Sequence, residues 1–82
     1  MFSNNEWMLN GKVVSVEEKT KGYWLSVKGI AENSTLFSSD IFRISCWISK
    51  RLIHRKPKGQ ISLSGRLVFK NKDCYFVADK IN

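Results

Sequence analysis

The chain has 82 residues, 43% of them hydrophobic, which is enough for one small domain with a core and too little for two. Its formal net charge of +7, from 14 Lys and Arg against 7 Asp and Glu, favours an anionic partner such as nucleic acid. Five glycines and one proline exclude collagen-like and low-complexity classes, and no apolar run reaches the roughly 18 residues of a membrane helix.

Alternation of apolar and polar residues, interrupted by polar clusters, predicts strands along the whole chain. The first strand is expected over residues 7–16, where the apolar face switches near Gly11. A bulge or sharp bend is therefore expected there. The second strand is expected over residues 22–30, with Trp24 and Lys28 on the face opposite its apolar side chains.

A polar loop is expected over residues 31–40, and it carries Phe37. The third strand is expected over residues 41–48. In that strand Arg43 and Trp47 lie opposite an apolar face, so their side chains are expected to point away from the core.

The segment after the third strand, residues 49–56, is predicted to form a short helix. Ser49 can cap its first turn, and Leu52 with Ile53 supplies a small apolar contact. Pro57 is expected to end the helix.

The fourth strand is expected over residues 60–70, where the alternation is nearly uninterrupted and ends with Phe69 facing inward. A tight turn then leads into the fifth strand over residues 74–81, with Tyr75 and Val77 expected to face inward. For Tyr75, a position beside the binding groove is the alternative.

These elements predict one all-β domain over residues 1–82. The expected architecture is a five-stranded antiparallel OB-fold, a Greek-key barrel with a short helix between the third and fourth strands. Such barrels bind oligonucleotides across their second and third strands. An SH3-like barrel is the main structural alternative, although it usually lacks a helix at this point and has shorter connections.

If the second and third strands pair, Trp24, Lys28, Arg43 and Trp47 share one solvent-facing surface. Stacking of a base on an aromatic ring contributes about 1–3 kcal/mol, and Arg and Lys meet phosphates. The alternative for each tryptophan is that a loop or the N-terminal segment covers it. Phe37 either clamps a base or packs against the mouth of the barrel.

Residues 41–72 contain nine basic residues and no acidic one. We expect part of this basic window to follow the phosphate backbone of a bound strand, and a solvated helix face is the alternative. The candidate contacts in it, besides Arg43, are Lys50, Arg51, Arg55, Lys56, Lys58 and Arg66.

Catalysis finds little support in the sequence, and no enzyme, metal or cofactor is expected. His54 lies among cations with no evident carboxylate to orient it. Cys46 and Cys74 lack zinc-site spacing and are expected to be two buried, reduced thiols. The N-terminal residues lack the features of a signal peptide, so a cytoplasmic location is expected.

Four stretches of the chain carry a family likeness: Leu9–Val14, Phe42–Leu52, Lys56–Leu67 and Phe76–Ile81. They resemble the bacterial single-stranded DNA-binding proteins of the OB-fold, including small members such as primosomal replication protein N and mobile-element single-strand-binding proteins. The resemblance implies that bases stack on Trp47. Typical members continue into a flexible tail with an acidic, apolar tip that recruits enzymes, whereas this sequence stops at Asn82, so an accessory role is expected.

The sequence thus predicts binding of single-stranded DNA, largely without sequence preference, by an accessory protein of replication, conjugation or a mobile element. RNA is an open alternative, because stacking and phosphate contacts serve both nucleic acids. The other alternative is an OB-fold interaction subunit that docks the same face on a helicase, primase or polymerase. Assembly of several copies through the first or fifth strand also stays open, and no membrane partner is expected.

Overall fold

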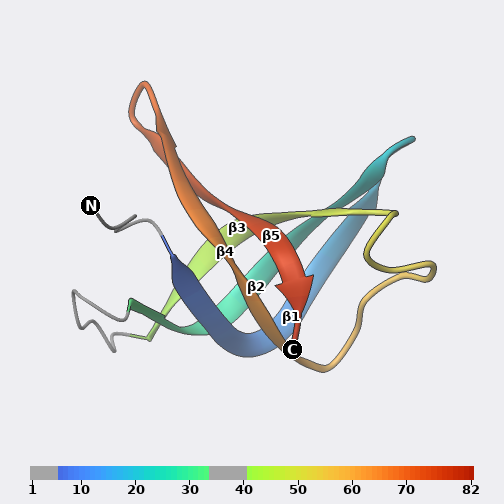
Figure 1. The fold of residues 1–82 in the computed structure, drawn as a ribbon, viewed down its shortest axis with the longest axis horizontal. Coiled ribbons are helices and arrows are strands. Elements are labelled where there is room, and N and C mark those ends of the chain that lie inside the picture. The colour runs from blue at the N-terminus through green and yellow to red at the C-terminus, as the bar shows by residue number, and fades with distance from the viewer. Residues whose placement is uncertain (1–5, 34–40) are drawn as a thin grey trace.

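The computed structural model of the protein describes residues 6–33 and 41–82, which form five strands (Figure 1). Within these residues, no helix has the length and apolar character that crossing a bilayer demands. The strands are β1 (Trp7–Glu18), β2 (Gly22–Asn33), β3 (Ile41–Ser49), β4 (Gln60–Lys70) and β5 (Asp73–Ile81).

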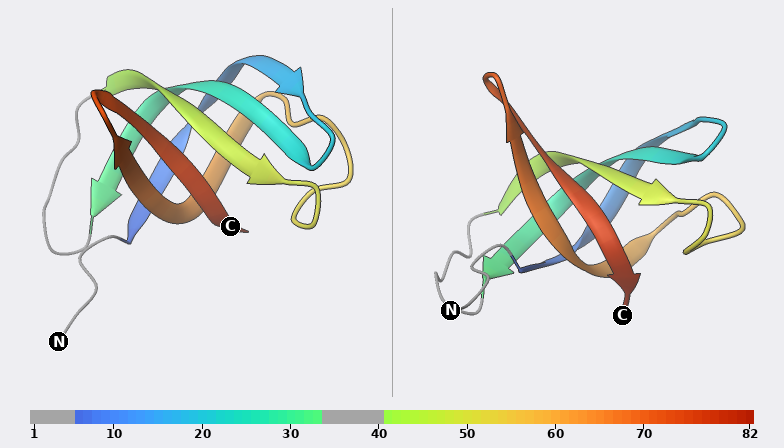
Figure 2. Two further views of the ribbon diagram at one scale, coloured as in Figure 1. Left: turned by 90° about the horizontal axis from the view of Figure 1, so that it is seen from above. Right: turned by 45° about the horizontal axis from the view of Figure 1, so that its top comes forward.

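The five strands close into a barrel in the order β1-β2-β3-β5-β4, with β5 inserted between β3 and β4 (Figure 2). Four of the neighbouring pairs are antiparallel, and the β3–β5 pair is parallel. The prediction of a wholly antiparallel barrel is therefore wrong in one pair. The reason is geometric: a closed ring with an odd number of strands cannot alternate direction at every step, so at least one pair must run parallel.

The predicted helix over residues 49–56 is also wrong, because the described chain between β3 and β4 forms a single turn followed by irregular backbone. The carbonyl oxygen of Ser49 accepts a hydrogen bond from the amide of Leu52 at 2.9 Å, and its hydroxyl accepts one from the amide of Arg51 at 3.1 Å. Three effects oppose a longer helix here. Nucleation is costly for so short a segment, its like charges are closely spaced, and Pro57 favours extended backbone in the residue before it.

The core is filled by alternate residues of every strand, as the two-residue period of a β-strand requires. Its largest fully buried side chains are Phe76, Leu9, Leu25, Ile48 and Leu63. The faces predicted for β2 to β4 are confirmed over the barrel wall where side chains are described. In β1, Val16 packs against the core as expected, whereas Val14 is 47% exposed. The faces of β5 are reversed, with Phe76 inward and Tyr75 and Val77 partly exposed. Cys74 to Ala78 is an uninterrupted apolar run, so its sequence carries no alternation from which the buried face can be read.

The β4–β5 hairpin projects beyond the barrel wall (Figure 1). Phe69, predicted to face the core, is 73% exposed, and its cross-strand neighbour Cys74 is exposed as well. Both positions follow the inward alternation of their strands, but the hairpin has already left the barrel where they occur. Cys46 alone is buried as expected, and burial raises its pKa to about 12, so the thiol stays protonated.

The bend expected near Gly11 is present as a β-bulge a few residues further on. Val13 pairs with Val27 and Ser15 with Ser26, which leaves Val14 as the extra residue. Gly11 itself lies opposite Gly29, and a Cβ atom on Gly11 would lie 2.6 Å from the carbonyl oxygen of Lys28. Close approach of β1 and β2 at this point therefore depends on glycine in both strands.

Replacing Gly29 by alanine is expected to destabilise the barrel by about 1–3 kcal/mol, because the new methyl group would collide with the backbone of β1. The measurement is the midpoint of urea-induced unfolding. Gly59→Asn is the matched control: nothing lies within 4 Å of a Cβ there, and asparagine tolerates the φ of +72°. A Gly29→Ala variant as stable as the parent would contradict the close approach.

Candidate nucleic-acid interface

Three aromatic rings gather on the outer face of β2, β3 and β5. Trp24 and Trp47 are direct cross-strand partners, with ring centroids 5.2 Å apart and planes inclined at 55°. Tyr75 of β5 meets Trp24 edge-on, at a centroid distance of 5.4 Å and an angle of 77°. We call these three residues the aromatic cluster. Parallel pairing of β5 with β3 places Tyr75 beside Ser45, which brings its ring within reach of the tryptophans.

The rings of the aromatic cluster are partly exposed, although each is shielded by another member. Inclined and edge-to-face pairs of this kind contribute about 0.5–1.5 kcal/mol beyond the area that they bury. Such contacts restrict the rotamers of the rings before any ligand arrives. The shape of the cluster is therefore already set in the protein alone.

A row of cations crosses the same side of the barrel further along the strands. Lys28 lies directly opposite Lys12 of β1 on one side and Arg43 of β3 on the other. All three side chains are exposed, and none takes part in an ion pair with the residues that the structure describes. Like charges on directly opposed positions destabilise a sheet. This cationic row therefore favours an anion.

Small hydroxyl side chains lie between the aromatic cluster and the cationic row. Ser26 of β2 is paired with Ser45 of β3, two residues from Trp24 and two residues from Lys28. Because serine is short, a ligand can lie close to the sheet at this point. Its hydroxyl group can both donate and accept hydrogen bonds, which suits bases, sugars and phosphates alike.

Trp47 also forms a wall of an open depression of about 720 Å³, which we call the loop pocket. Its indole lies over Gly22, where a Cβ atom would be only 2.7 Å from the ring. The other lining residues come from the β1–β2 turn and from the chain after β3, and most are basic: Lys21, Ser49, Lys50, Arg51 and His54. The pocket thus joins one aromatic face to several cationic groups.

One lysine of the loop pocket is already engaged within the protein. The Lys50 ammonium donates to Oε2 of Glu18 at 2.8 Å and lies 5.5 Å from the centre of the Tyr23 ring. Its backbone amide donates to the carbonyl oxygen of Lys21 at 3.0 Å. The hydrogen bond to Lys50 lowers the pKa of Glu18, and the same bond raises the pKa of Lys50. These contacts tie the chain after β3 to the β1–β2 turn.

The sequence-predicted contacts fall into two groups. Trp24, Lys28, Arg43 and Trp47 do share one face, and Lys50 and Arg51 line the loop pocket beside it. The remaining predicted cations are exposed but lie outside the lining of that pocket, and they are Arg55, Lys56, Lys58 and Arg66.

Arg66 borders the face from the far side. It projects from β4 opposite Val77, whose other neighbour is Trp47, and its Nε atom lies 3.5 Å from a carboxylate oxygen of Asp79. Phe37 lies outside the described residues.

Sequence reasoning missed Tyr75, Lys12 and Lys21. Tyr75 was expected to face inward, with a position beside the binding groove as the alternative, because the fifth strand carries no alternation from which its face can be read. Lys12 becomes a candidate only through the strand register, which places it opposite Lys28. Lys21 becomes one only because the β1–β2 turn lies against the chain after β3. Knowledge of which strands pair, and in which register, would have identified Tyr75 and Lys12.

Comparisons with protein-family models, with curated proteins and with solved structures find no match for this chain. The resemblance to single-stranded DNA-binding proteins therefore stays a prediction from the sequence. What this face does has to be argued from its own geometry.

The Glu18–Lys50 pair gives a prediction on pH. Because the pKa of Glu18 is lowered from 4.5 in the folded protein, its contribution to stability is present above that value and is lost as the pH falls through the folded pKa. The parent is therefore expected to lose more stability than Glu18→Gln on acidification from neutral pH. The measurement is urea unfolding along a pH series.

Glu17→Gln is the matched control for this series, because it removes the adjacent carboxylate, which pairs with nearby Lys19 at 3.1 Å. Identical acid profiles for the parent and Glu18→Gln would show that the pair contributes nothing to folding.

Proposed function

We propose that this chain binds single-stranded nucleic acid, with single-stranded DNA as the first candidate, largely without sequence preference and without catalysing a reaction. The observation that carries the proposal is the aromatic cluster, where Trp24, Trp47 and Tyr75 lie together on a solvent-facing sheet. Large aromatic rings are seldom grouped on an outer surface without a ligand or partner. Every base offers a flat ring to stack on them, whatever the sequence.

The architecture supports the same proposal. We assign the closed barrel with the order β1-β2-β3-β5-β4 to the OB-fold, in which the second and third strands carry the oligonucleotide. Here Trp24 and Lys28 come from the second strand, and Arg43 and Trp47 come from the third. The candidate interface thus lies where this fold most often binds its ligand.

In this proposal the outer face of β2, β3 and β5 makes two kinds of contact with the strand. The aromatic cluster stacks bases, and Lys28 and Arg43 of the cationic row, together with Lys21 and Arg51 of the loop pocket, neutralise phosphates. For single strands, the logarithm of affinity falls with the logarithm of salt concentration by a slope of about −0.7 for each phosphate neutralised. A module of this kind would act in the cytoplasm wherever strands are exposed, as in replication, conjugation or the movement of a mobile element.

A protein partner is the second candidate, and the same two tryptophans favour it, because tryptophan and tyrosine are enriched at the centres of protein interfaces. A helicase, primase or polymerase could be held by this face in place of nucleic acid. Purified protein that binds an oligonucleotide with no partner present would favour the first candidate. No binding at micromolar protein and low salt would favour the second.

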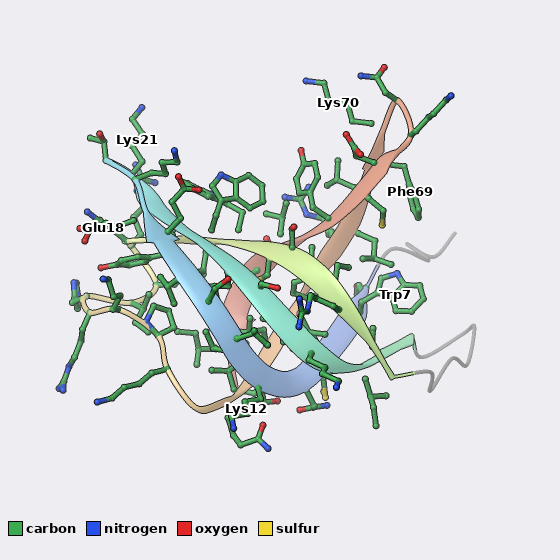
Figure 3. All side chains as sticks on the ribbon, turned by 180° about the vertical axis from the view of Figure 1, so that it is seen from behind. Trp7, Lys12, Glu18, Lys21, Phe69 and Lys70 are labelled. Carbon is green, nitrogen blue, oxygen red and sulfur yellow. The ribbon has the colours of Figure 1, made fainter. Side chains whose placement is uncertain are left out.

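Trp47→Ala is expected to weaken binding of an oligo-dT of about 16 nucleotides by about 1–3 kcal/mol, because one base loses its stacking partner. The measurement is anisotropy of a labelled oligonucleotide, followed together with quenching of tryptophan emission. Trp7→Phe is the control, since Trp7 lies on β1 and packs against the core (Figure 3). Full affinity in a folded Trp47→Ala variant would remove stacking on Trp47 from the proposal.

A further inference from the structure

A second open depression, also of about 720 Å³, lies over β1 and the strands on either side of it. We call it the first-strand groove. It is lined in part by the facing glycines Gly11 and Gly29. Polar and cationic side chains make up most of the rest, namely Asn10, Lys12, Lys28, Gln60, Ser62 and Asn82. Ile30 and Ile61 complete the lining.

The chemistry of this lining suits a phosphodiester backbone rather than a base. Lys12 and Lys28 are directly opposed, and amides and a hydroxyl surround them as hydrogen-bond donors. None of the described residues that line the groove is aromatic, so it offers no ring on which a base can stack.

The groove is continuous with the proposed interface through Lys28. That lysine lines the groove and is also the middle member of the cationic row, with Arg43 on its other side. An anion on this row would relieve the repulsion between cations that the fold holds on opposed positions. The row therefore connects the outer face of β3 to the groove over β1.

We propose that the first-strand groove is a second binding segment for the same single strand, which leaves the aromatic cluster, crosses the cationic row and continues around the barrel over β1. This inference rests on the proposed function. In the groove the strand is held by its phosphates and sugars, and in the cluster it is held by its bases.

The two segments are far enough apart that ligand length decides whether both are occupied. Lys28 is four residues along β2 from Trp24, about 13 Å in an extended strand. Lys12 lies one strand further, at about 5 Å. A dinucleotide on the cluster does not reach Lys12, whereas a longer oligonucleotide does.

The test compares a thymidine dinucleotide with oligo-dT of about 16 nucleotides, the upper end of the site sizes of single OB-folds. Lys12→Gln is expected to leave the affinity for the short oligonucleotide unchanged. For the long one, the slope of log affinity against log salt should become shallower by about 0.7, which corresponds to a loss of about fivefold at about 0.1 M salt relative to 1 M. Relief of repulsion from Lys28 should leave the variant at least as stable as the parent.

Lys70→Gln is the matched control, because it removes one exposed positive charge at the opposite end of the molecule (Figure 3). The inference is overturned if Lys12→Gln binds the long oligonucleotide like the parent, if it weakens both lengths equally, or if Lys70→Gln has the same effect. Failure of the proposed function looks different, because the parent itself would then bind neither length.

Discussion

Closure of the barrel with five strands is the constraint on which the rest of the molecule depends. An odd ring requires a parallel pair, and this chain meets the requirement by inserting β5 between β3 and β4. The same insertion buries Phe76 at the centre of the core and turns Tyr75 outward against Trp24. The geometry that completes the core thus also completes the aromatic cluster.

Charge is distributed over this scaffold in two different ways. At the loop pocket Lys50 is paired with Glu18, which fastens two turns together. In the cationic row Lys12, Lys28 and Arg43 are set against one another with no acidic partner among the described residues. The Lys50–Glu18 pair stabilises the protein by itself. The cationic row, by contrast, would be stabilised by an anionic ligand.

Local alternation predicted most of the fold, because the strands that line the core alternate cleanly. It located β4 to the residue, anticipated the bulge in β1 and brought Trp24 and Trp47 to one face. It failed where the sequence does not alternate, or where the outcome depends on contacts between distant segments. The apolar run around Tyr75 has no period, the exposure of Phe69 depends on where the barrel ends, and the parallel pair follows from closure of the ring. These are properties of the assembled barrel rather than of any one segment.

The place of β5 also sets an order of events during synthesis. This strand is made after the other four, yet β3 and β4 have no shared neighbour until it arrives. Pairings between segments distant in sequence form slowly, since the loop between them must close first. A nascent chain whose β5 is still inside the ribosome therefore has an open sheet, and its aromatic cluster lacks Tyr75. The proposed binding of a strand should therefore appear only when the ring closes, in the same step as cooperative folding.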